Sequence, residues 1–236
     1  MHKRIGILGG MSPESTAEYY QYIIHAYQKR FGNHGYPEII IYSVSFQDYV
    51  DWPKAGRWDL IAQGLGQAAR QLQAAGADFI IIATNTMHLV VEEIRAQIEI
   101  PVLSLLDVVG DAIQARGLGT VGLLGTAFTM GSHFYQDALQ KRSIQVLTPD
   151  AEDQRYVNQV IYDELVNGTL RDESRAGYLN VIEKLAQRGA QGIILGCTEI
   201  PLLIKPGDTP LPLFDTTLLH AEAALNYAIG ETHVTL

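Results

Sequence analysis

The sequence predicts an α/β protein built from two similar domains with parallel sheets. Two short apolar runs that end in glycine, residues 4–10 and 120–126, share one pattern. A second matched pair of apolar runs, residues 79–86 and 192–198, follows the first pair at nearly the same sequence separation in both halves. Between the runs, apolar residues recur at three- and four-residue spacing, the period of an amphipathic helix. Strands that alternate with helices favour right-handed crossovers and parallel sheets.

The expected elements follow the same order in both halves. Each half begins with its glycine-ended strand, continues with a helix that ends in a Gly-Ala unit, and then has a second apolar strand. A short Pro-containing strand closes each half, so three landmarks recur in register. The expected elements are strands 4–10, 79–86 and 100–103 with helix 60–74, and strands 120–126, 192–198 and 211–214 with helix 176–185.

These repeats divide the chain into an N-terminal domain, residues 1–115, and a second domain, residues 116–216. Residues 115–119, with two glycines, are the best candidate for a linker. An amphipathic pattern over residues 218–227 predicts a C-terminal helix that packs back on the first domain. The N-terminal domain is therefore expected to include residues 217–236.

Composition excludes several function classes. The formal net charge is −9, and no cluster of Lys and Arg forms a surface that would neutralise phosphates, which argues against nucleic-acid binding. No apolar stretch reaches the roughly 18 residues of a membrane span, and the N-terminus has no signal-peptide pattern. The single cysteine excludes an intramolecular disulfide and a thiolate zinc cluster. We expect a cytoplasmic protein that acts on a small molecule.

That cysteine, Cys197, lies where an apolar strand ends and a loop begins. In parallel α/β sheets the carboxyl ends of the strands form the ligand crevice, so a thiol there can meet a substrate. Gly196 allows close approach, while Thr198 and Glu199 make the loop polar. The alternative interpretation is an inert buried thiol, since free cysteine is among the most buried residue types.

Thr84 occupies the position in the first half that matches Cys197 in the second. Two equivalent strand ends from two similar domains can face each other across a cleft, and a ligand between them would be approached from both sides. Such a cleft suits chemistry at a stereocentre. Asn85, Thr86 and Thr198 offer uncharged groups that could orient a small polar ligand. The alternative is that these residues only cap the helix that follows.

The turn after the first strand, Gly9-Gly10-Met11-Ser12-Pro13-Glu14, carries helix-start signals. Ser12 is placed as the N-cap and Pro13 at the first helical position. Backbone amides at Gly10, Met11 and Ser12 could hold a carboxylate or a phosphate, although a plain turn fits equally well. The pattern lacks the third glycine of the dinucleotide fingerprint, so no nicotinamide cofactor is expected.

His88 lies four residues beyond Thr84 and could act as a proton shuttle or support the site from behind; the alternative is a structural role. No pair of histidines has metal-ligand spacing, so no metal is expected. No lysine ends an apolar strand run where a pyridoxal Schiff base would form. The sequence thus predicts chemistry without a cofactor.

Together, several motifs resemble the aspartate/glutamate racemase family over nearly the whole chain. These motifs are Gly9-Gly10-Met11-Ser12, Asn85-Thr86-Met87-His88, Leu124-Gly125-Thr126, Gly196-Cys197-Thr198-Glu199-Ile200 and Phe214-Asp215-Thr216. The sequences of these motifs are most similar to the aspartate racemase branch, including its broad-specificity and L-aspartate/glutamate-specific members. The resemblance implies two flavodoxin-like domains, a cofactor-independent two-base mechanism and a homodimer.

The resemblance also implies residue roles. Cys197 and Thr84 would be catalytic, with His88 and Glu199 supporting them. The expected substrate-binding residues are Gly10, Met11, Ser12, Asn85, Thr86, Thr126 and Thr198.

The chain departs from the family at Thr84, where the family has its first catalytic cysteine. A hydroxyl is a far weaker base than a thiolate, so a symmetrical two-thiol mechanism is excluded. Family members use the second-domain cysteine for the L-isomer, which implies that Cys197 deprotonates an L-amino acid. Thr84, through water or His88, would then deliver the proton on the other face. Val166 and Gln47-Asp48 stand where many aspartate racemases carry cationic residues for an acidic side chain.

The leading interpretation is a racemase acting on L-aspartate, L-glutamate or a related L-amino acid. A decarboxylase or isomerase of the same superfamily, using the single cysteine to protonate a planar intermediate, is the second. A non-catalytic amino-acid-binding protein that has lost turnover with the first cysteine is the third.

Overall fold

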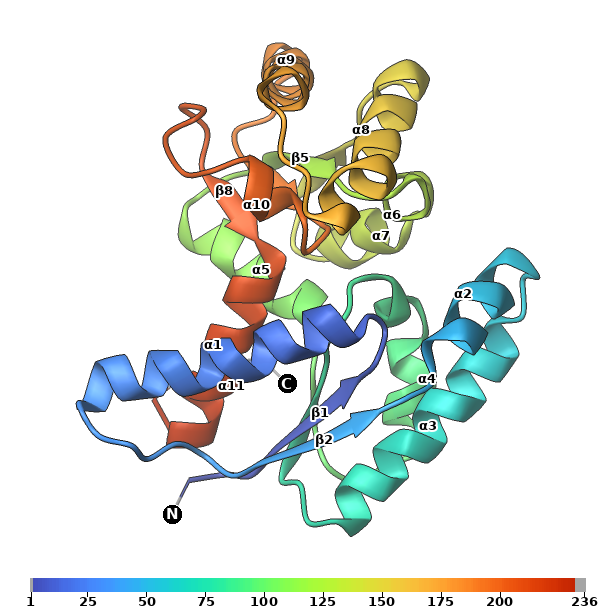
Figure 1. Ribbon diagram of the computed structural model, residues 1–236, viewed down its shortest axis with the longest axis vertical. Helices are drawn as coiled ribbons and strands as arrows, with labels where there is room; N and C mark the ends of the chain where they lie inside the picture. Colours follow the sequence, from blue (N-terminus) through green and yellow to red (C-terminus); the bar gives the residue numbers. More distant parts are fainter. Residues whose placement is uncertain (1, 232–236) are drawn as a thin grey trace. The chain divides into compact units, whose positions relative to one another are not determined.

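The computed structural model describes residues 2–231, and the chain divides into two α/β units (Figure 1). The first unit contains Met1–Val108 and Thr217–Leu236, and the second contains Val109–Thr216. Each unit holds one four-stranded sheet in which all recorded strand pairs are parallel. The two-domain α/β fold with parallel sheets that the sequence predicts is confirmed.

The first unit has the sheet order β2-β1-β3-β4. Its elements are β1 (Ile5–Gly9), α1 (Pro13–Phe31), β2 (Ile39–Ser43), α2 (Phe46–Lys54), α3 (Trp58–Ala74), β3 (Phe79–Ile82), the 3-10 helix η1 (Thr86–Val90), α4 (Val91–Arg95), β4 (Val102–Leu103) and the returning helix α11 (Thr216–Ile229). The central strands β1 and β3 are buried along their whole length, as expected for parallel strands covered on both faces.

The second unit repeats this plan with the sheet order β6-β5-β7-β8. Its elements are α5 (Leu105–Ala115), which begins in the first unit, β5 (Thr120–Leu124), α6 (Ala127–Gly131), α7 (Phe134–Gln140), β6 (Gln145–Leu147), α8 (Ala151–Asp163), the 3-10 helix η2 (Leu165–Asn167), α9 (Asp172–Gln187), β7 (Ile193–Leu195), α10 (Ile200–Leu203) and β8 (Leu213–Asp215). Both orders match the first four strands of the flavodoxin-like order.

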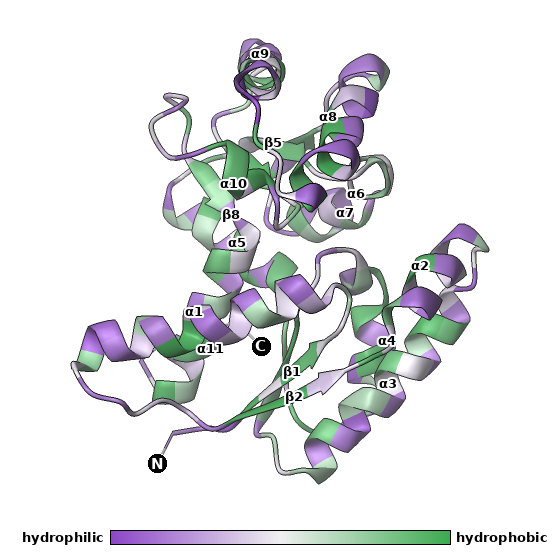
Figure 2. Ribbon diagram, viewed as in Figure 1, coloured by the Kyte–Doolittle hydropathy of each residue, from purple (hydrophilic) through white to green (hydrophobic). Residues whose placement is uncertain are grey.

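Apolar side chains cover both faces of the first sheet. On one face, Leu65 and Leu72 of α3 pack with residues of β1 and β3. On the other, Ile5 and Ile7 pack with α1 and with Ala221 and Leu225 of α11. The hydrophobic colour of the sheet strands and of the inner side of α3 follows this arrangement (Figure 2). The first unit therefore owes one of its covering helices to the C-terminal end of the chain.

The boundary between the units lies inside α5, between Val108 and Val109, whereas the sequence analysis put it at residues 115/116. Glycine and polar composition pointed to the turn after α5. The helix itself instead carries the chain from one unit into the next, and its first turn belongs to the first unit.

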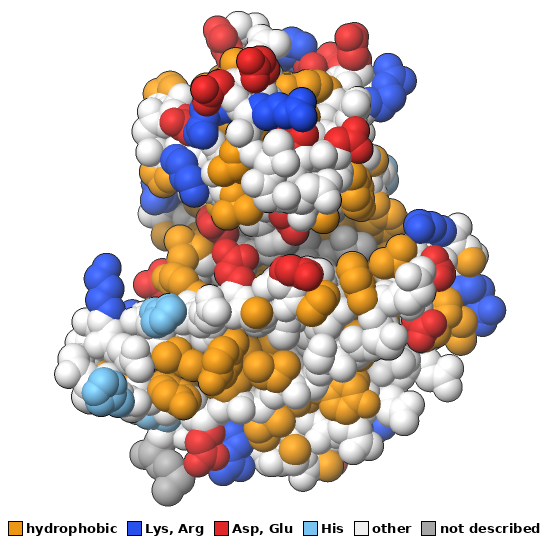
Figure 3. Space-filling view, in the orientation of Figure 1, with side chains coloured by type: hydrophobic (Ala, Val, Ile, Leu, Met, Phe, Trp, Pro, Cys, Tyr) orange, Lys and Arg blue, Asp and Glu red, His pale blue; other side chains and the backbone are white. Residues whose placement is uncertain are grey.

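Two strands, β2 and β6, have no counterpart among the expected elements. Both lie at sheet edges and pair with one neighbour only. In β2, Ile41 and Tyr42 are exposed, and exposed hydrophobic side chains lie on the visible face of the first unit between α1 and β2 (Figure 3). Over the described residues, no helix combines the length and apolarity that crossing a bilayer requires.

Candidate active site

Cys197 and Thr84 occupy equivalent strand ends in the two sheets. Cys197 follows β7 by two residues and Thr84 follows β3 by two residues. The amide of Gly196 donates to Leu124 O of β5 at 2.7 Å, and the amide of Ala83 donates to Leu8 O of β1 at 2.9 Å. The residue before each candidate is thus the last one held by the neighbouring strand. Both candidates begin a loop at the carboxyl edge of their sheet, where ligands bind in such folds.

The thiol of Cys197 is partly buried and donates a hydrogen bond to Glu199 Oε2 at 2.9 Å. Burial raises the pKa of the Cys197 thiol well above its ordinary value, and the negative charge of Glu199 raises it further. The backbone amides of Glu199 and Thr198 act in the opposite direction and lower this pKa, because they stabilise the thiolate. At neutral pH the resting group is therefore a neutral thiol with a proton acceptor already in place.

Tyr162, at the end of α8, is a residue that the sequence analysis missed. Burial raises the pKa of Tyr162, and the negative charges of Glu199 and of the thiolate form of Cys197 raise it further. Its side chain is nevertheless 57% exposed, as Val166 on η2 is 55% exposed. The signal was weak because Tyr162 precedes the cysteine by a whole helix and strand. Uncharged side chains thus stand on η2 and α8 in the unit that holds Cys197.

Thr84 is partly buried, and its hydroxyl makes no hydrogen bond to any other described residue. Its carbonyl oxygen accepts a hydrogen bond from His88 Nδ1 at 2.8 Å. The preceding carbonyl, that of Ala83, accepts from the Ser15 hydroxyl of α1 at 3.0 Å. The backbone of this loop is thus fixed on both sides of Thr84, while the hydroxyl stays available to a ligand or a water molecule.

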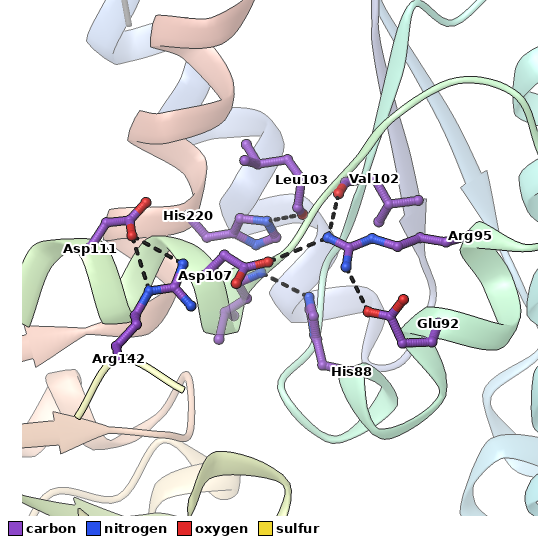
Figure 4. A network of polar contacts seen from close by, with 10 residues as sticks. His88, Glu92, Arg95, Val102, Leu103, Asp107, Asp111, Arg142 and His220 are labelled. Atoms are coloured by element: carbon purple, nitrogen blue, oxygen red, sulfur yellow. Dashed lines mark hydrogen bonds and ion pairs between the residues drawn. The ribbon is translucent and has the colours of Figure 1, made fainter. Parts of the chain in front are cut away.

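His88 is buried, and both of its ring nitrogens have partners, of which Figure 4 shows one. Because Nδ1 must donate to Thr84 O, Nε2 carries no proton and accepts from the amide of Leu105 at 3.0 Å. Burial lowers the pKa of His88 to about 4, so the ring is neutral at pH 7. A proton shuttle needs an accessible nitrogen, so the structure argues against that expectation. His88 instead supports the Thr84 loop.

The turn after β1 forms the helix start that the sequence predicts. The Ser12 side chain caps α1 by accepting from the amide of Ser15 at 3.2 Å. The amide of Gly10, however, already donates to Thr16 Oγ1 at 2.8 Å. Of the three amides expected to hold an anion, those of Met11 and Ser12 have no hydrogen-bond partner within the described part of the chain. An anion at this site would therefore be held by two amides and not three.

The remaining predicted residues follow the strands β3, β5 and β7. Asn85 is buried and Thr86 opens η1 beside Thr84. Thr198 follows Cys197 and is partly buried. Thr126 follows β5, but its hydroxyl caps α6 by accepting from the amide of Thr129 at 3.2 Å. The predicted residues are thus divided between the two units. The capping of α6 by Thr126 was not predicted from the sequence.

A recess of about 430 Å³ in the first unit contains none of these residues. It lies beside β2 and is lined by Tyr42, Tyr49 and Trp52 among others. Among residues 2–231, no group of three or more His, Cys, Asp or Glu side chains is arranged to hold a metal ion.

Comparisons with known proteins identify the family of the chain. Residues 8–224 match the family described as Asp/Glu/Hydantoin racemase. The "Broad specificity amino-acid racemase RacX" of Bacillus subtilis (strain 168) is 28% identical over 225 residues, which cover 94% of this chain and 96% of that protein. A solved structure of a putative Asp/Glu racemase from Yersinia pestis is 43% identical, with a TM-score of 0.92 over 96% of this chain and 99% of its own. An aspartate racemase homologue from Pyrococcus horikoshii OT3 is 38% identical, with a TM-score of 0.86 over 97% and 100% of the two chains.

Proposed function

The chain belongs to the Asp/Glu/Hydantoin racemase family, and on this premise we propose that it racemises an L-amino acid without a cofactor, with Cys197 as the base and Thr84 on the opposite face. The single observation that carries the proposal is the hydrogen bond from Cys197 Sγ to Glu199 Oε2. It joins the chain's only thiol to a proton acceptor at a strand end of the kind that holds substrates.

The first half of the reaction uses Cys197 and Glu199. Glu199 takes the thiol proton along the existing hydrogen bond, and the amides of Thr198 and Glu199 stabilise the thiolate that results. The thiolate then removes the α-proton of the L-substrate, and the electron pair of the broken C–H bond stays on the substrate as a planar carbanion. A thiolate is the active form of cysteine in such steps.

The second half delivers a proton to the other face. The Thr84 hydroxyl, which has no partner among the described residues, donates the proton directly or through a water molecule. Water then reprotonates Thr84, and Glu199 releases to water the proton that it took from the thiol. Reprotonation from the Thr84 face gives the D-isomer. If the Cys197 thiol exchanges its hydrogen with water before it returns one, the product is the L-isomer carrying solvent hydrogen. Because a hydroxyl is a poor acid and base, we expect exchange with retention to be faster than inversion.

L-Aspartate, L-glutamate and related L-amino acids are the proposed substrates. A carboxylate is expected at the amides of Met11 and Ser12, since they point from a helix start and lack other partners in the described chain. Tyr162 and Val166, in the unit that holds Cys197, add no positive charge for an acidic side chain. A panel that includes neutral L-amino acids is therefore needed beside the two acidic ones.

Deuterium uptake at the α-carbon tests the proposal. Wild-type protein in D₂O should exchange the α-proton of at least one L-amino acid and form some D-isomer, as measured by mass spectrometry and chiral chromatography. Cys197→Ser should abolish both processes and keep the fold, since a hydroxyl cannot replace the thiolate. Exchange by a well-folded Cys197→Ser protein would remove Cys197 from the mechanism.

The same measurement separates the other interpretations. A half-reaction enzyme exchanges without inversion, and a binding protein does neither. A one-cysteine decarboxylase would release carbon dioxide from a substituted malonate.

The proposal also includes a homodimer and a cytoplasmic location, which light scattering on the purified protein and cell fractionation can test.

A further inference from the structure

His220 of α11 is a buried side chain with two hydrogen-bond partners on two other elements. Its Nε2 bonds to Leu103 O at the end of β4, at 2.9 Å, and its Nδ1 bonds to the hydroxyl of Tyr19 on α1, also at 2.9 Å. A carbonyl oxygen only accepts, so Nε2 carries the proton and Nδ1 accepts from Tyr19. Burial lowers the pKa of His220 to about 3, so the ring is neutral at working pH, and the two hydrogen bonds fix its tautomer.

The junction between β4 and α5 is held between two imidazoles. His220 binds the carbonyl of Leu103, and His88 accepts from the amide of Leu105, two residues further along. The two rings lie 5.7 Å apart, and Figure 4 shows them approaching the junction from different elements. The first amide of α5 therefore has its partner in η1, and the last carbonyl of β4 has its partner in α11.

These contacts close into a ring that contains the Thr84 loop. From His88 the ring passes to Thr84 O, and Ala83 O next to it is bound by Ser15 of α1. Ser15 and Tyr19 are both buried and lie one helical turn apart on α1, so they share a face. Tyr19 leads back to His220. One circuit of side-chain contacts thus joins the start of α1, the Thr84 loop, the β4–α5 junction and α11.

We propose that His220 is a positioning residue for Thr84, which it fixes through the β4–α5 junction and His88. The inference rests on the proposed function, since it assigns to Thr84 the proton transfer on one face. His220 touches no reacting atom. Its hydrogen bond to Leu103 O fixes the junction in the position at which the Leu105 amide can donate to His88. His88 in turn donates to the Thr84 carbonyl oxygen.

The physical reason is that both ring nitrogens of His220 and both ring nitrogens of His88 are occupied by hydrogen bonds. A neutral imidazole with one donor and one acceptor both satisfied has one orientation only. If His220 loses its polar atoms, its hydrogen bonds to Leu103 O and to the Tyr19 hydroxyl are both lost, and this contact no longer fixes the junction to α11. Small displacements of a proton donor have large kinetic effects, because proton transfer needs hydrogen-bond distance.

The first test compares inversion with exchange on the Cys197 face. His220→Phe keeps an aromatic ring but removes both hydrogen bonds. We expect it to lower inversion of the L-substrate on the order of ten-fold or more, with little change in deuterium exchange with retention. Leu225→Ala is the matched control, because Leu225 is fully buried on the same helix in the same core but lies outside the ring. This control should leave the ratio of inversion to exchange unchanged.

A conservative variant identifies which of the two bonds matters. His220→Gln keeps a donor near the position of Nε2 and can still bind Leu103 O, while it gives up the bond to Tyr19. Because the proposed route runs through Leu103, His220→Gln should restore most of the inversion that His220→Phe loses. Equal loss in both variants would overturn the route through the junction.

A second readout does not depend on catalysis. In a protein carrying Cys197→Ser and Thr84→Cys, the introduced thiol is the only one in the chain, so its alkylation rate by iodoacetamide reports how position 84 is placed. Adding His220→Phe should change this rate several-fold, and adding Leu225→Ala should not. An unchanged rate in a folded protein would overturn the proposal.

The outcomes separate this inference from the proposed function. If wild-type protein exchanges no α-proton, the proposed function fails, while the alkylation experiment still tests the placement of residue 84. If wild type exchanges and inverts, but His220→Phe lowers both rates in parallel as Leu225→Ala does, then the racemase assignment stands and His220 has only a structural role.

Discussion

At the scale of single residues, the pair formed by Cys197 and Glu199 should respond in two opposite ways to loss of the carboxylate charge. Glu199 raises the pKa of the Cys197 thiol, after the larger effect of burial, so Glu199→Gln should lower that pKa and increase the thiolate fraction at a given pH. The same change removes the proton acceptor of the hydrogen bond, so exchange at pH 7 should fall. More thiolate and less catalysis would then occur together.

Alkylation by iodoacetamide across pH measures the first effect without ambiguity, because Cys197 is the only cysteine in the chain. Deuterium exchange at the α-carbon measures the second. Asp163→Asn, which neutralises a carboxylate elsewhere in the same unit, is the control. An alkylation profile that does not move in Glu199→Gln would show that the carboxylate does not act on the thiol.

Thr84→Cys tests the proton transfer on the face opposite Cys197, where the proposed group is a hydroxyl. A second thiol is a far better acid and base than a hydroxyl, with an ordinary pKa of about 8.5, so inversion should accelerate relative to exchange with retention. The equilibrium constant between two free enantiomers is one, so kcat/KM for inversion must rise equally from both isomers. The ratio of D-isomer formed to deuterium incorporated checks this expectation. No change in that ratio would mean that residue 84 does not face the α-carbon.

The sequence located the strand ends of the site but could not locate their supports. Glycine-ended apolar runs and the internal repeat predicted that Thr84 and Cys197 are equivalent, and the matched backbone bonds of Ala83 and Gly196 agree. The hydrogen bonds of His88 could not be foreseen, because a lone histidine has no spacing signal for its partners. The contact between Tyr19 and His220 spans 201 positions and depends on how the last helix packs.

At the scale of elements, the turn between β1 and α1 requires glycine at position 10. Gly10 has φ of +91°, and a Cβ there would collide with the backbone of Val44 after β2. Gly10→Ala should therefore lower the free energy of unfolding by more than the roughly 1–2 kcal/mol that the left-handed conformation alone costs. It should also displace the amides of Met11 and Ser12, so exchange activity should fall with stability. Urea unfolding measures the first effect.

Gly56→Ala supplies the comparison for this turn. Gly56 also has a positive φ, +69°, but no atom lies within 4 Å of the position that its Cβ would take. The cost there should be limited to the left-handed conformation, roughly 1–2 kcal/mol. If both variants lose the same stability, the contact with Val44 contributes nothing and the role of Gly10 is conformational only.

The strands β2 and β6 were not predicted from the sequence, and this has a physical reason. Central strands such as β1, β3, β5 and β7 are covered on both faces and give continuous apolar runs. The edge strands β2 and β6 are partly exposed and do not resemble each other, since β2 has three consecutive isoleucines and β6 is Gln145–Leu147, so the internal repeat marks neither of them. Periodicity detects what is buried, and an edge strand needs only backbone pairing with its neighbour.

At the scale of the whole molecule, the first unit is discontinuous in sequence, since α11 belongs to it and β8, just before that helix, does not. The end of α11 lies against the beginning of the chain, where the amide of Lys3 donates to Ala228 O at 2.8 Å. The Lys3 ammonium also stands 4.0 Å from the centre of the Tyr227 ring. The covering helix and the first strand can therefore be joined by a short linker without moving either one.

This connection predicts how fragments of the chain should fold. A fragment of residues 1–108 leaves one face of its sheet, including Ile5 and Ile7, without the Ala and Leu side chains of α11. Each large apolar side chain that loses its burial costs about 1.5–3 kcal/mol, against a total stability of roughly 5–15 kcal/mol for a domain. The fragment alone should not unfold cooperatively.

A permuted fragment, in which residues 216–231 precede residue 2 through a short glycine-serine linker, should unfold cooperatively on heating when followed by circular dichroism. The same permuted fragment carrying Leu225→Ala should melt at a lower temperature, because it opens a cavity in the contact that the fusion restores. Cooperative melting of residues 1–108 alone, at the midpoint of the permuted fragment, would mean that α11 covers the sheet without holding it together.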